Sequence, residues 1–156
     1  MDCITHINLL RYYSRQRQNI RILVVNKIQN WAEELDLFDD VMDQYQMLID
    51  MAKKPTTLPE ELRSDDKLVS GCISSIWVDV GAVDNKTRIY YDSDAMITKG
   101  VTHVICDCFD DLPLDEAKQI ERDDFEALAL EGILSSNRRN GLSSLISTLQ
   151  TKVAAL

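Results

Sequence analysis

The fold of this chain is decided in residues 72–80, which read CISSIWVDV. Side chains alternate along the second half of this stretch: Ile76, Val78 and Val80 share one face, and Trp77 falls on the other. A period of two is typical of a β-strand with one buried face. The sequence therefore predicts a strand over 72–80 whose apolar face must be covered by other elements.

A second strand is expected after a short turn. Residues 84–86 read Asp-Asn-Lys, and Asp and Asn favour turns because their short side chains bond to the local backbone. Residues 87–92 are rich in β-branched and aromatic side chains, which predicts a return strand and hence a hairpin. A two-stranded hairpin is only marginally stable in water, so helices or further strands must pack on it.

Helices are expected on both sides of the hairpin, because apolar residues recur there at spacings of three and four. These segments, some of them short, lie at 28–35, 41–52, 97–108, 114–121, 124–131 and 142–153. Asp39 or Asp40 is expected to cap the second helix, and Ser93 or Asp94 the third. Strand residues are few and separate from the helices along the chain. The predicted class is therefore α+β, a small antiparallel sheet (the central hairpin) packed against helices.

Composition excludes several classes of protein. The 156 residues are 45% hydrophobic, which suffices for one domain with its own core. No apolar run approaches the roughly 18 residues of a membrane span, so we expect no membrane contact. The net charge is −9, whereas a nucleic-acid binder carries a basic surface, so we expect no nucleic-acid partner. The four cysteines are too few and too irregularly spaced for a disulfide framework, so we expect free thiols and a cytoplasmic location.

Charge sets the first residues apart from the rest. Residues 1–32 hold five bases and one acid, whereas the remainder of the chain is strongly acidic. An arginine-rich, acid-poor terminus is typical of an organelle transit peptide. The alternatives are a frayed basic arm and a translation start assigned too early. We expect residues 1–23 to be a poorly ordered basic extension and residues 24–156 to be the domain.

Cys72 is the candidate nucleophile. It follows Gly71, where a flexible junction enters the first predicted strand and leaves room for a second reactant. The surrounding run 68–78 carries no charge, and an apolar setting keeps a thiol neutral until something activates it. The alternative is a buried structural cysteine, because cysteine is among the residues most often found in cores.

The cysteines at 106 and 108 do not predict a metal site. At about 100° per residue, Cys108 falls on the apolar stripe of the third helix and Cys106 on the opposite side. His103 and Cys106 are three residues apart and supply at most half a site. Because structural zinc usually has four protein ligands, we expect no metal.

A polar tract is the second candidate binding feature. Residues 135–141 read SSNRRNG and are expected to form a loop before the last helix. Backbone amides at the start of that helix, together with Arg138, suit an anion or a carboxylate of a partner. An ordinary solvated turn is the alternative. The sequence motifs of phosphate-binding loops, α/β-hydrolase elbows and zinc proteases are missing.

Three motifs in a fixed order carry a family resemblance. In chain order they are Gly71-Cys72-x-Ser74-x-x-Trp77, Ser93-Asp94-Ala95 with Gly100, and Arg138-x-x-Gly141-Leu142. Together with the upstream run LPEEL at 58–62, they resemble the SufE family, over about 24–156. The resemblance implies the two-layer fold that SufE proteins share with iron–sulfur scaffolds of the NifU type.

The resemblance also implies a function. In SufE proteins the cysteine of the Gly-Cys pair accepts persulfide sulfur from a cysteine desulfurase, stimulates that enzyme, and passes the sulfur to iron–sulfur cluster assembly. Carried over by position, Cys72 is the acceptor, and Gly71, Ser74, Asp94 and Arg138 shape its surroundings or the partner surface. The implied partners are a SufS-type or CsdA-type desulfurase and an iron–sulfur scaffold complex. No cofactor and no stand-alone enzymatic activity are implied for the chain itself.

Departures from the family and rival functions complete the sequence-based picture. The family often has glutamine directly after its cysteine, where this chain has Ile73, and Cys106 and Cys108 have no place in the family pattern. One rival function is an iron–sulfur scaffold that uses Cys72, Cys106 or Cys108, and His103. The other rival is a non-catalytic binding adaptor in which Cys72 is an inert core residue.

Overall fold

The computed structural model describes residues 11, 15 and 23–156. Its helices and strands are helix 23–36, α2 (Val41–Ala52), β1 (Ile76–Val83), β2 (Lys86–Ser93), α3 (Met96–Phe109), α4 (Leu114–Ala117) and α5 (Ser136–Ala154). Short 3₁₀ turns lie at Glu60–Leu62, Asp65–Lys67, Arg122–Leu128 and Leu130–Gly132. The expected basic extension 1–23 lies almost wholly outside the described residues. None of the described helices combines the length and the apolar character needed to cross a bilayer.

The hairpin predicted from the sequence is confirmed. β1 and β2 pair antiparallel, with Val78 opposite Tyr91, and the two turn residues Asp84 and Asn85 have φ of 52° and 60°. Two consecutive left-handed residues give the turn the twist that matches its strands. The alternating pattern predicted that the first strand begins at residue 72, but it begins at Ile76. The reason is tertiary, because the four preceding residues belong to a loop described below.

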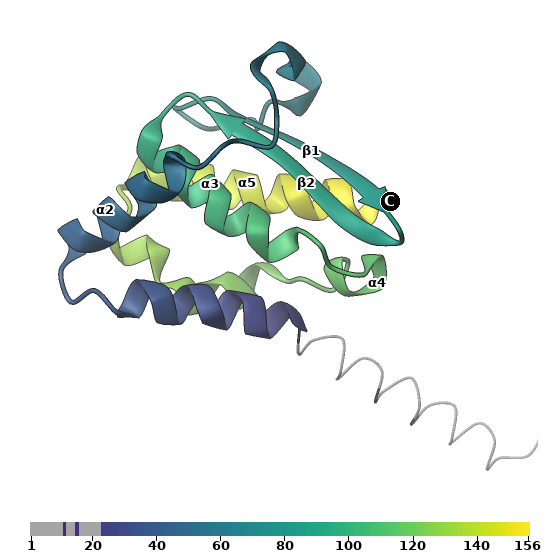
Figure 1. Cartoon of the computed structure of the whole chain (residues 1–156), viewed down its shortest axis with the longest axis horizontal. Helices are drawn as coiled ribbons and strands as arrows, with labels where there is room; N and C mark the ends of the chain where they lie inside the picture. The colour runs from purple at the N-terminus through teal and green to yellow at the C-terminus, as the bar shows by residue number, and fades with distance from the viewer. Residues whose placement is uncertain (1–10, 12–14, 16–22) are drawn as a thin grey trace, which may run out of the picture.

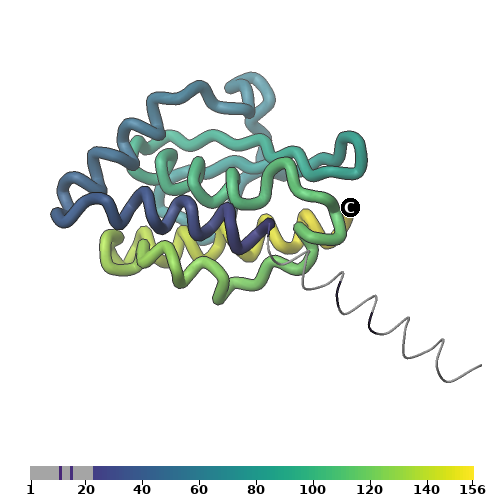
Figure 2. Tube along the Cα trace, turned by 60° about the horizontal axis from the view of Figure 1, so that its bottom comes forward, coloured from purple at the N-terminus to yellow at the C-terminus, as the bar shows by residue number. Residues whose placement is uncertain are grey.

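Helices cover one face of the hairpin and form the second layer of the α+β fold. In Figure 1 the hairpin lies above α3 and α5, and helix 23–36 lies below them. α3 is the central helix, because it packs on α2, α5 and both strands. The turned view in Figure 2 shows the 120–135 segment running beside helix 23–36 at the edge of the helical layer. This arrangement surrounds α3 with protein on several sides.

The packing of α2 on α3 depends on one glycine. A Cβ atom on Gly100 would lie 1.9 Å from the backbone oxygen of Leu48, well inside any allowed contact. The two helices therefore approach through bare backbone at this point, which fixes the position of the second turn of α3. Val101 and Thr102, which follow Gly100, line the same pocket as the candidate nucleophile Cys72.

The predicted cap of α2 is confirmed, whereas the predicted cap of α3 is not. Asp40 caps α2 as expected, and its carboxylate accepts a hydrogen bond from the backbone amide of Met42 at 2.6 Å. The prediction of Ser93 or Asp94 as the cap of α3 was wrong, since the N-cap is Ala95 and no side chain bonds there. Both polar side chains are instead used to hold Ser75.

Candidate functional site

Cys72 lies in a loop, residues 70–75, that is closed at its base. The amide of Val69 donates to the carbonyl of Ile76 at 2.8 Å, and an isolated bridge pairs Leu68 with Trp77. These contacts pair Leu68 and Val69 antiparallel with the first two residues of β1. The six residues between Val69 and Ile76 are therefore an excursion from the sheet, and their two ends are fixed relative to each other.

The far end of the loop is clamped to the start of α3. Asp94 accepts a hydrogen bond from the Ser75 amide at 3.0 Å, and the Asp94 amide donates to the Ser75 carbonyl at 3.3 Å. The Ser93 hydroxyl donates to that same carbonyl at 2.8 Å. Both polar groups of the Ser75 backbone are thus satisfied by residues 93 and 94. The predicted site residue Asp94 acts on the loop, not on the sulfur directly.

Gly71 gives the loop its shape. Its φ of +81° lies in the left-handed region that side chains disfavour, and a Cβ atom there would lie 3.3 Å from the hydroxyl of Ser144 on α5. The chain therefore turns sharply directly before Cys72. This turn directs the Cys72 side chain toward α5.

The Cys72 thiol is partly buried against the second turn of α5. Its Sγ donates a long hydrogen bond to the carbonyl of Gly141, with 3.6 Å between the two atoms. A Cβ atom on Gly141 would lie 3.4 Å from that sulfur, so the helix leaves just enough room for the thiol. Burial raises the pKa of the Cys72 thiol above its ordinary value of 9.0. Alone, the protein therefore holds this sulfur protonated and only moderately reactive.

A pocket of about 320 Å³ adjoins the thiol. Its walls come from three segments that are far apart in the sequence: the Cys72 loop, the first turns of α3, and the start of α5 with the residues before it. The lining residues include Ser74, Thr98, Val101, Leu134, Arg138 and Leu142. The wall next to the sulfur combines aliphatic side chains with hydroxyl groups and one guanidinium.

Arg138 lies at the rim of this pocket, as part of α5 itself. The prediction that residues 135–141 form a loop was wrong, because the helix begins at Ser136 and the polar tract forms its first turns. The side chain of Arg138 is exposed and donates to the Tyr45 hydroxyl of α2 at 3.2 Å. A cation and the amino end of a 19-residue helix thus face the opening beside Cys72.

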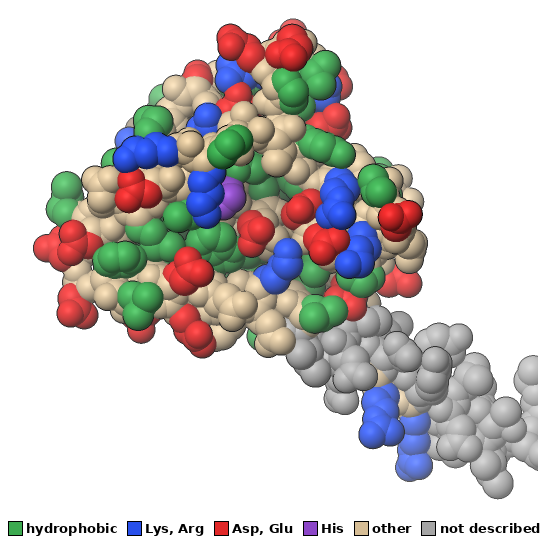
Figure 3. Space-filling model, viewed as in Figure 1, with side chains coloured by type: hydrophobic (Ala, Val, Ile, Leu, Met, Phe, Trp, Pro, Cys, Tyr) green, Lys and Arg blue, Asp and Glu red, His purple; other side chains and the backbone are tan. Residues whose placement is uncertain are grey.

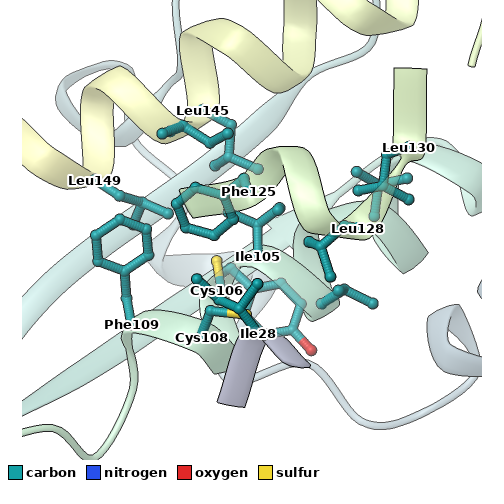
Figure 4. Close-up of a cluster of buried hydrophobic side chains, with 14 of the residues drawn as sticks. Ile28, Ile105, Cys106, Cys108, Phe109, Phe125, Leu128, Leu130, Leu145 and Leu149 are labelled. Atoms are coloured by element: carbon teal, nitrogen blue, oxygen red, sulfur yellow. The ribbon is translucent and has the colours of Figure 1, made fainter. Parts of the chain in front are cut away.

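Cys106 and Cys108 both belong to the core. Figure 4 shows their side chains in one cluster with Ile28, Ile105 and Phe125. Helix periodicity puts Cys106 opposite the stripe that contains Cys108, yet that side is buried as well, since the exposed fraction of Cys106 is 1%. An amphipathic surface helix is covered on one side, whereas α3 is packed against two helices and both strands. The side of α3 opposite its apolar stripe is therefore partly buried as well. Burial raises the pKa of both thiols, that of Cys108 to about 12.

No metal centre is formed in the part of the chain that the structure describes. Within residues 11, 15 and 23–156, no three His, Cys, Asp or Glu side chains are grouped so as to hold an ion. The His103 ring is used structurally, with its Nδ1 2.6 Å from the Tyr91 hydroxyl and its plane perpendicular to the Trp31 ring. Cys3 and His6 lie outside the described residues.

The structure brings all of the sequence-predicted site residues into one region. Cys72, Ser74 and Arg138 line the pocket, Gly71 precedes the sulfur, and Asp94 holds the loop. Sequence reasoning did not single out Gly141 or Tyr45 as contacts of the site. A glycine inside a helix is an available signal for Gly141, because it costs stability and usually has a packing reason. Nothing in the sequence pairs Tyr45 with Arg138, which is 93 residues away.

The fold and the site define a small α+β domain with a single partly buried thiol in a closed loop. Comparison with known proteins identifies its family. The domain family SufE, described as "Fe-S metabolism associated domain", matches residues 29–153. The chain therefore belongs to the SufE family, and its domain is one associated with Fe–S metabolism.

Individual relatives agree with this assignment. The chain is 29% identical over 128 residues to SufE-like protein 1, chloroplastic/mitochondrial, of Arabidopsis thaliana, covering 80% of this chain but only 34% of that protein. It is 28% identical over 124 residues to an uncharacterized SufE-like protein of Synechocystis, covering 80% and 78% of the two chains. The solution structure of a hypothetical protein from Thermus thermophilus has the same fold, with a TM-score of 0.69 at 18% identity over 83% of this chain and 94% of that one.

Proposed function

We propose that this protein accepts persulfide sulfur on Cys72 from a SufS-type or CsdA-type cysteine desulfurase and delivers it to an iron–sulfur scaffold complex. The observation that carries the proposal is the placement of one thiol in a closed loop beside a pocket, within a SufE-family domain. In this proposal the domain at 24–156 is the sulfur carrier. Its chemistry needs no cofactor of its own.

The transfer step is a thiol–persulfide exchange. The Cys72 thiolate attacks the outer sulfur of the desulfurase persulfide, and a new S–S bond forms at Cys72 Sγ. The S–S bond on the desulfurase breaks, and its electron pair stays on the desulfurase cysteine as a thiolate. That thiolate takes up the proton which Cys72 has lost. A thiol and a persulfide become a persulfide and a thiol, with no net oxidation.

Two features of the free protein support a partner-activated mechanism. The thiol faces Gly141 and is partly buried, so it must turn outward to reach another protein. Its pKa is raised by burial, and no base is within hydrogen-bonding distance of the sulfur among its described contacts. We propose that the loop opens about Gly71 and the Ser75 clamp when the desulfurase binds, and that the partner's site promotes deprotonation.

The proposed setting is a reducing compartment, the cytoplasm in our proposal. Cys72, Cys106 and Cys108 are free thiols in the structure, and reducing conditions keep the acceptor available. The name of the Arabidopsis relative places that protein in chloroplasts and mitochondria.

The proposal is tested by the turnover of a purified SufS-type desulfurase with L-cysteine and reductant. Addition of the protein should raise alanine production, and the Cys72→Ser variant should not. Cys106→Ser and Cys108→Ala are the matched controls, because both thiols are buried and should leave the stimulation in place if the variants fold. Equal stimulation by wild type and Cys72→Ser would overturn the acceptor role.

A further inference from the structure

The residue next to the candidate nucleophile is an aliphatic side chain turned to solvent. Ile73 is 78% exposed, whereas Cys72 directly before it is partly buried against α5. Both residues line the same pocket, but the loop leaves the isoleucine open to solvent while the thiol beside it is partly covered. Exposed aliphatic residues are common on proteins, so exposure alone carries no inference, and Leu37 is just as exposed at 79%.

The position of Ile73 distinguishes it from other exposed residues. Consecutive Cα atoms are about 3.8 Å apart, and the S–S bond formed in the transfer is about 2 Å long. A donor protein that brings its persulfide to Cys72 must therefore cover the Ile73 side chain as well. Because Ile73 directly follows the reacting cysteine, the protein that packs on it is the sulfur donor. No other strongly exposed aliphatic side chain among the described residues is adjacent to Cys72 in the chain.

A second apolar side chain lies in the same region. Met96, 49% exposed, is the first residue of α3. The hydrogen bonds between Asp94 and Ser75 bring the start of α3 beside the loop, and Thr98 lines the same pocket as Ile73. Ile73 lines the pocket, and Met96 follows two residues after Asp94, which binds the loop at Ser75. We call these two exposed side chains the apolar rim. Arg138, also exposed, adds a positive charge to the pocket lining.

We propose that the apolar rim is an anchor for the desulfurase, with Ile73 inserted into an apolar depression beside the partner's persulfide. This inference rests on the proposed sulfur transfer and adds a determinant of partner affinity to it. Because Ile73 is exposed and the sulfur's hydrogen bond goes to Gly141, Ile73 affects how tightly the protein binds a desulfurase, and which desulfurase it binds. The reactivity of the Cys72 thiol in the free protein does not depend on it.

The test compares Ile73→Ser, Ile73→Gln and the conservative Ile73→Leu with wild type. Leu37→Ser is the matched control, because Leu37 has the same exposure and lies at the corner between helix 23–36 and α2. The readouts are the concentration that gives half-maximal stimulation of a purified SufS-type desulfurase, the maximal stimulation, and the rate of Cys72 alkylation by iodoacetamide in the free protein.

The serine and glutamine variants should raise the half-maximal concentration about 10- to 100-fold, the effect of losing one buried aliphatic side chain. Maximal stimulation and alkylation should stay at wild-type values, and Ile73→Leu and Leu37→Ser should behave like wild type. An unchanged half-maximal concentration in Ile73→Ser, or an equal rise in Leu37→Ser, would overturn the anchor. Failure of the sulfur transfer itself is seen separately, as absence of stimulation by the wild-type protein.

Discussion

At the scale of single residues, the central feature is a thiol kept in its unreactive form. Burial raises the pKa of Cys72, and its only hydrogen-bond partner in the described contacts is a neutral carbonyl acceptor. A carbonyl stabilises the protonated thiol and does nothing for the thiolate. The free protein therefore protects its sulfur, and in our proposal the binding partner activates it.

The pH dependence of Cys72 alkylation should report this protection. In the folded protein, the iodoacetamide rate for Cys72 should rise with a midpoint above pH 9.0, because only the thiolate reacts. In urea the midpoint should fall to the ordinary thiol value. The linked effect on stability has a definite sign: the unfolded state loses this proton first, so stability falls as the pH rises above 9.0. A folded-state midpoint at or below 9.0 would contradict the account.

Asp92 is a buried charge at the end of β2 that binds Arg63, upstream of the Cys72 loop, and Lys99 of α3. Its carboxylate, 3% exposed as a residue, binds the Arg63 guanidinium, with Nε at 2.9 Å, and the Lys99 ammonium at 3.3 Å. Burial by itself would raise the pKa of Asp92, but hydrogen bonds from Arg63 and the Ser93 amide, with the charge of Lys99, hold it below the ordinary value of 3.8. Arg63 also stacks over the Trp77 ring, which joins residue 63 to β1.

Replacement of Asp92 by Asn should therefore lower the free energy of unfolding by about 2–4 kcal/mol, because two cations lose a buried partner. The contribution of Asp92 is present above pH 3.8 and is lost as the pH falls through its lowered pKa. Urea unfolding measures both effects. Asp111→Asn is the control, because its ion pairs with Lys86 and Arg88 are exposed to solvent and should add little to stability. Equal losses in the two variants would contradict this ranking.

At the scale of elements, the Cys72 loop is held at two places that differ in strength. The backbone pairing of Val69 with Ile76 belongs to the sheet, whereas the clamp on Ser75 combines a long backbone bond from the Asp94 amide with bonds to the side chains of Ser93 and Asp94. Asp94 is exposed, and hydrogen bonds that water can reach open more easily than a strand pairing. The loop should therefore open from its Ser75 end.

Asp94→Ala should raise the rate of Cys72 alkylation severalfold, because the Ser75 amide loses its acceptor and the loop opens more often. Asp94→Asn keeps an acceptor oxygen and should stay near the wild-type rate. The rates are read from the Cys72 peptide after timed exposure to iodoacetamide at constant pH. An unchanged rate in Asp94→Ala would show that the sheet pairing alone controls the loop.

The contact between α2 and α3 gives a prediction on stability. Gly100→Ala places a methyl group where the Leu48 carbonyl lies, so the helices must separate, at a cost of about 2 kcal/mol or more. Gly132→Ala meets nothing within 4 Å and serves as the control. Denaturant unfolding should show a lower midpoint for the first variant only. A wild-type unfolding midpoint for Gly100→Ala would mean that the backbones of α2 and α3 are farther apart at Gly100 than the structure shows.

The comparison of sequence and structure is also clearest for elements. Periodicity correctly predicted the hairpin, α2, α3 and the buried stripe from Ile97 to Cys108. It failed where tertiary contacts decide. The start of β1 was placed too early because the pairing of Val69 with Ile76 turns residues 70–75 into a loop. The burial of Cys106 was not predicted, because the pattern of one helix does not reveal how many neighbours surround that helix.

At the scale of the whole molecule, the site is assembled from segments that no local pattern connects. The pocket needs the loop after residue 69, the start of α3 and the start of α5, and α2 supplies the partner of Arg138. The residues themselves pointed to Cys72 and Arg138, whereas Ser74 and Asp94 were predicted as site residues only through the order of three family motifs. Figure 3 shows acidic and basic side chains interspersed on one face of the molecule, so the net charge of −9 is not gathered in a single patch there.

The measurement that tests the central claim most directly is the location of transferred sulfur. The protein is incubated with a SufS-type desulfurase and L-cysteine without reductant, thiols and persulfides are trapped by alkylation, and peptide masses are measured by mass spectrometry. We expect a gain of about one sulfur atom (roughly 32 Da) on the Cys72 peptide, and no gain in Cys72→Ser. Sulfur on Cys106 or Cys108, or none on any peptide while the desulfurase is active, would contradict the account.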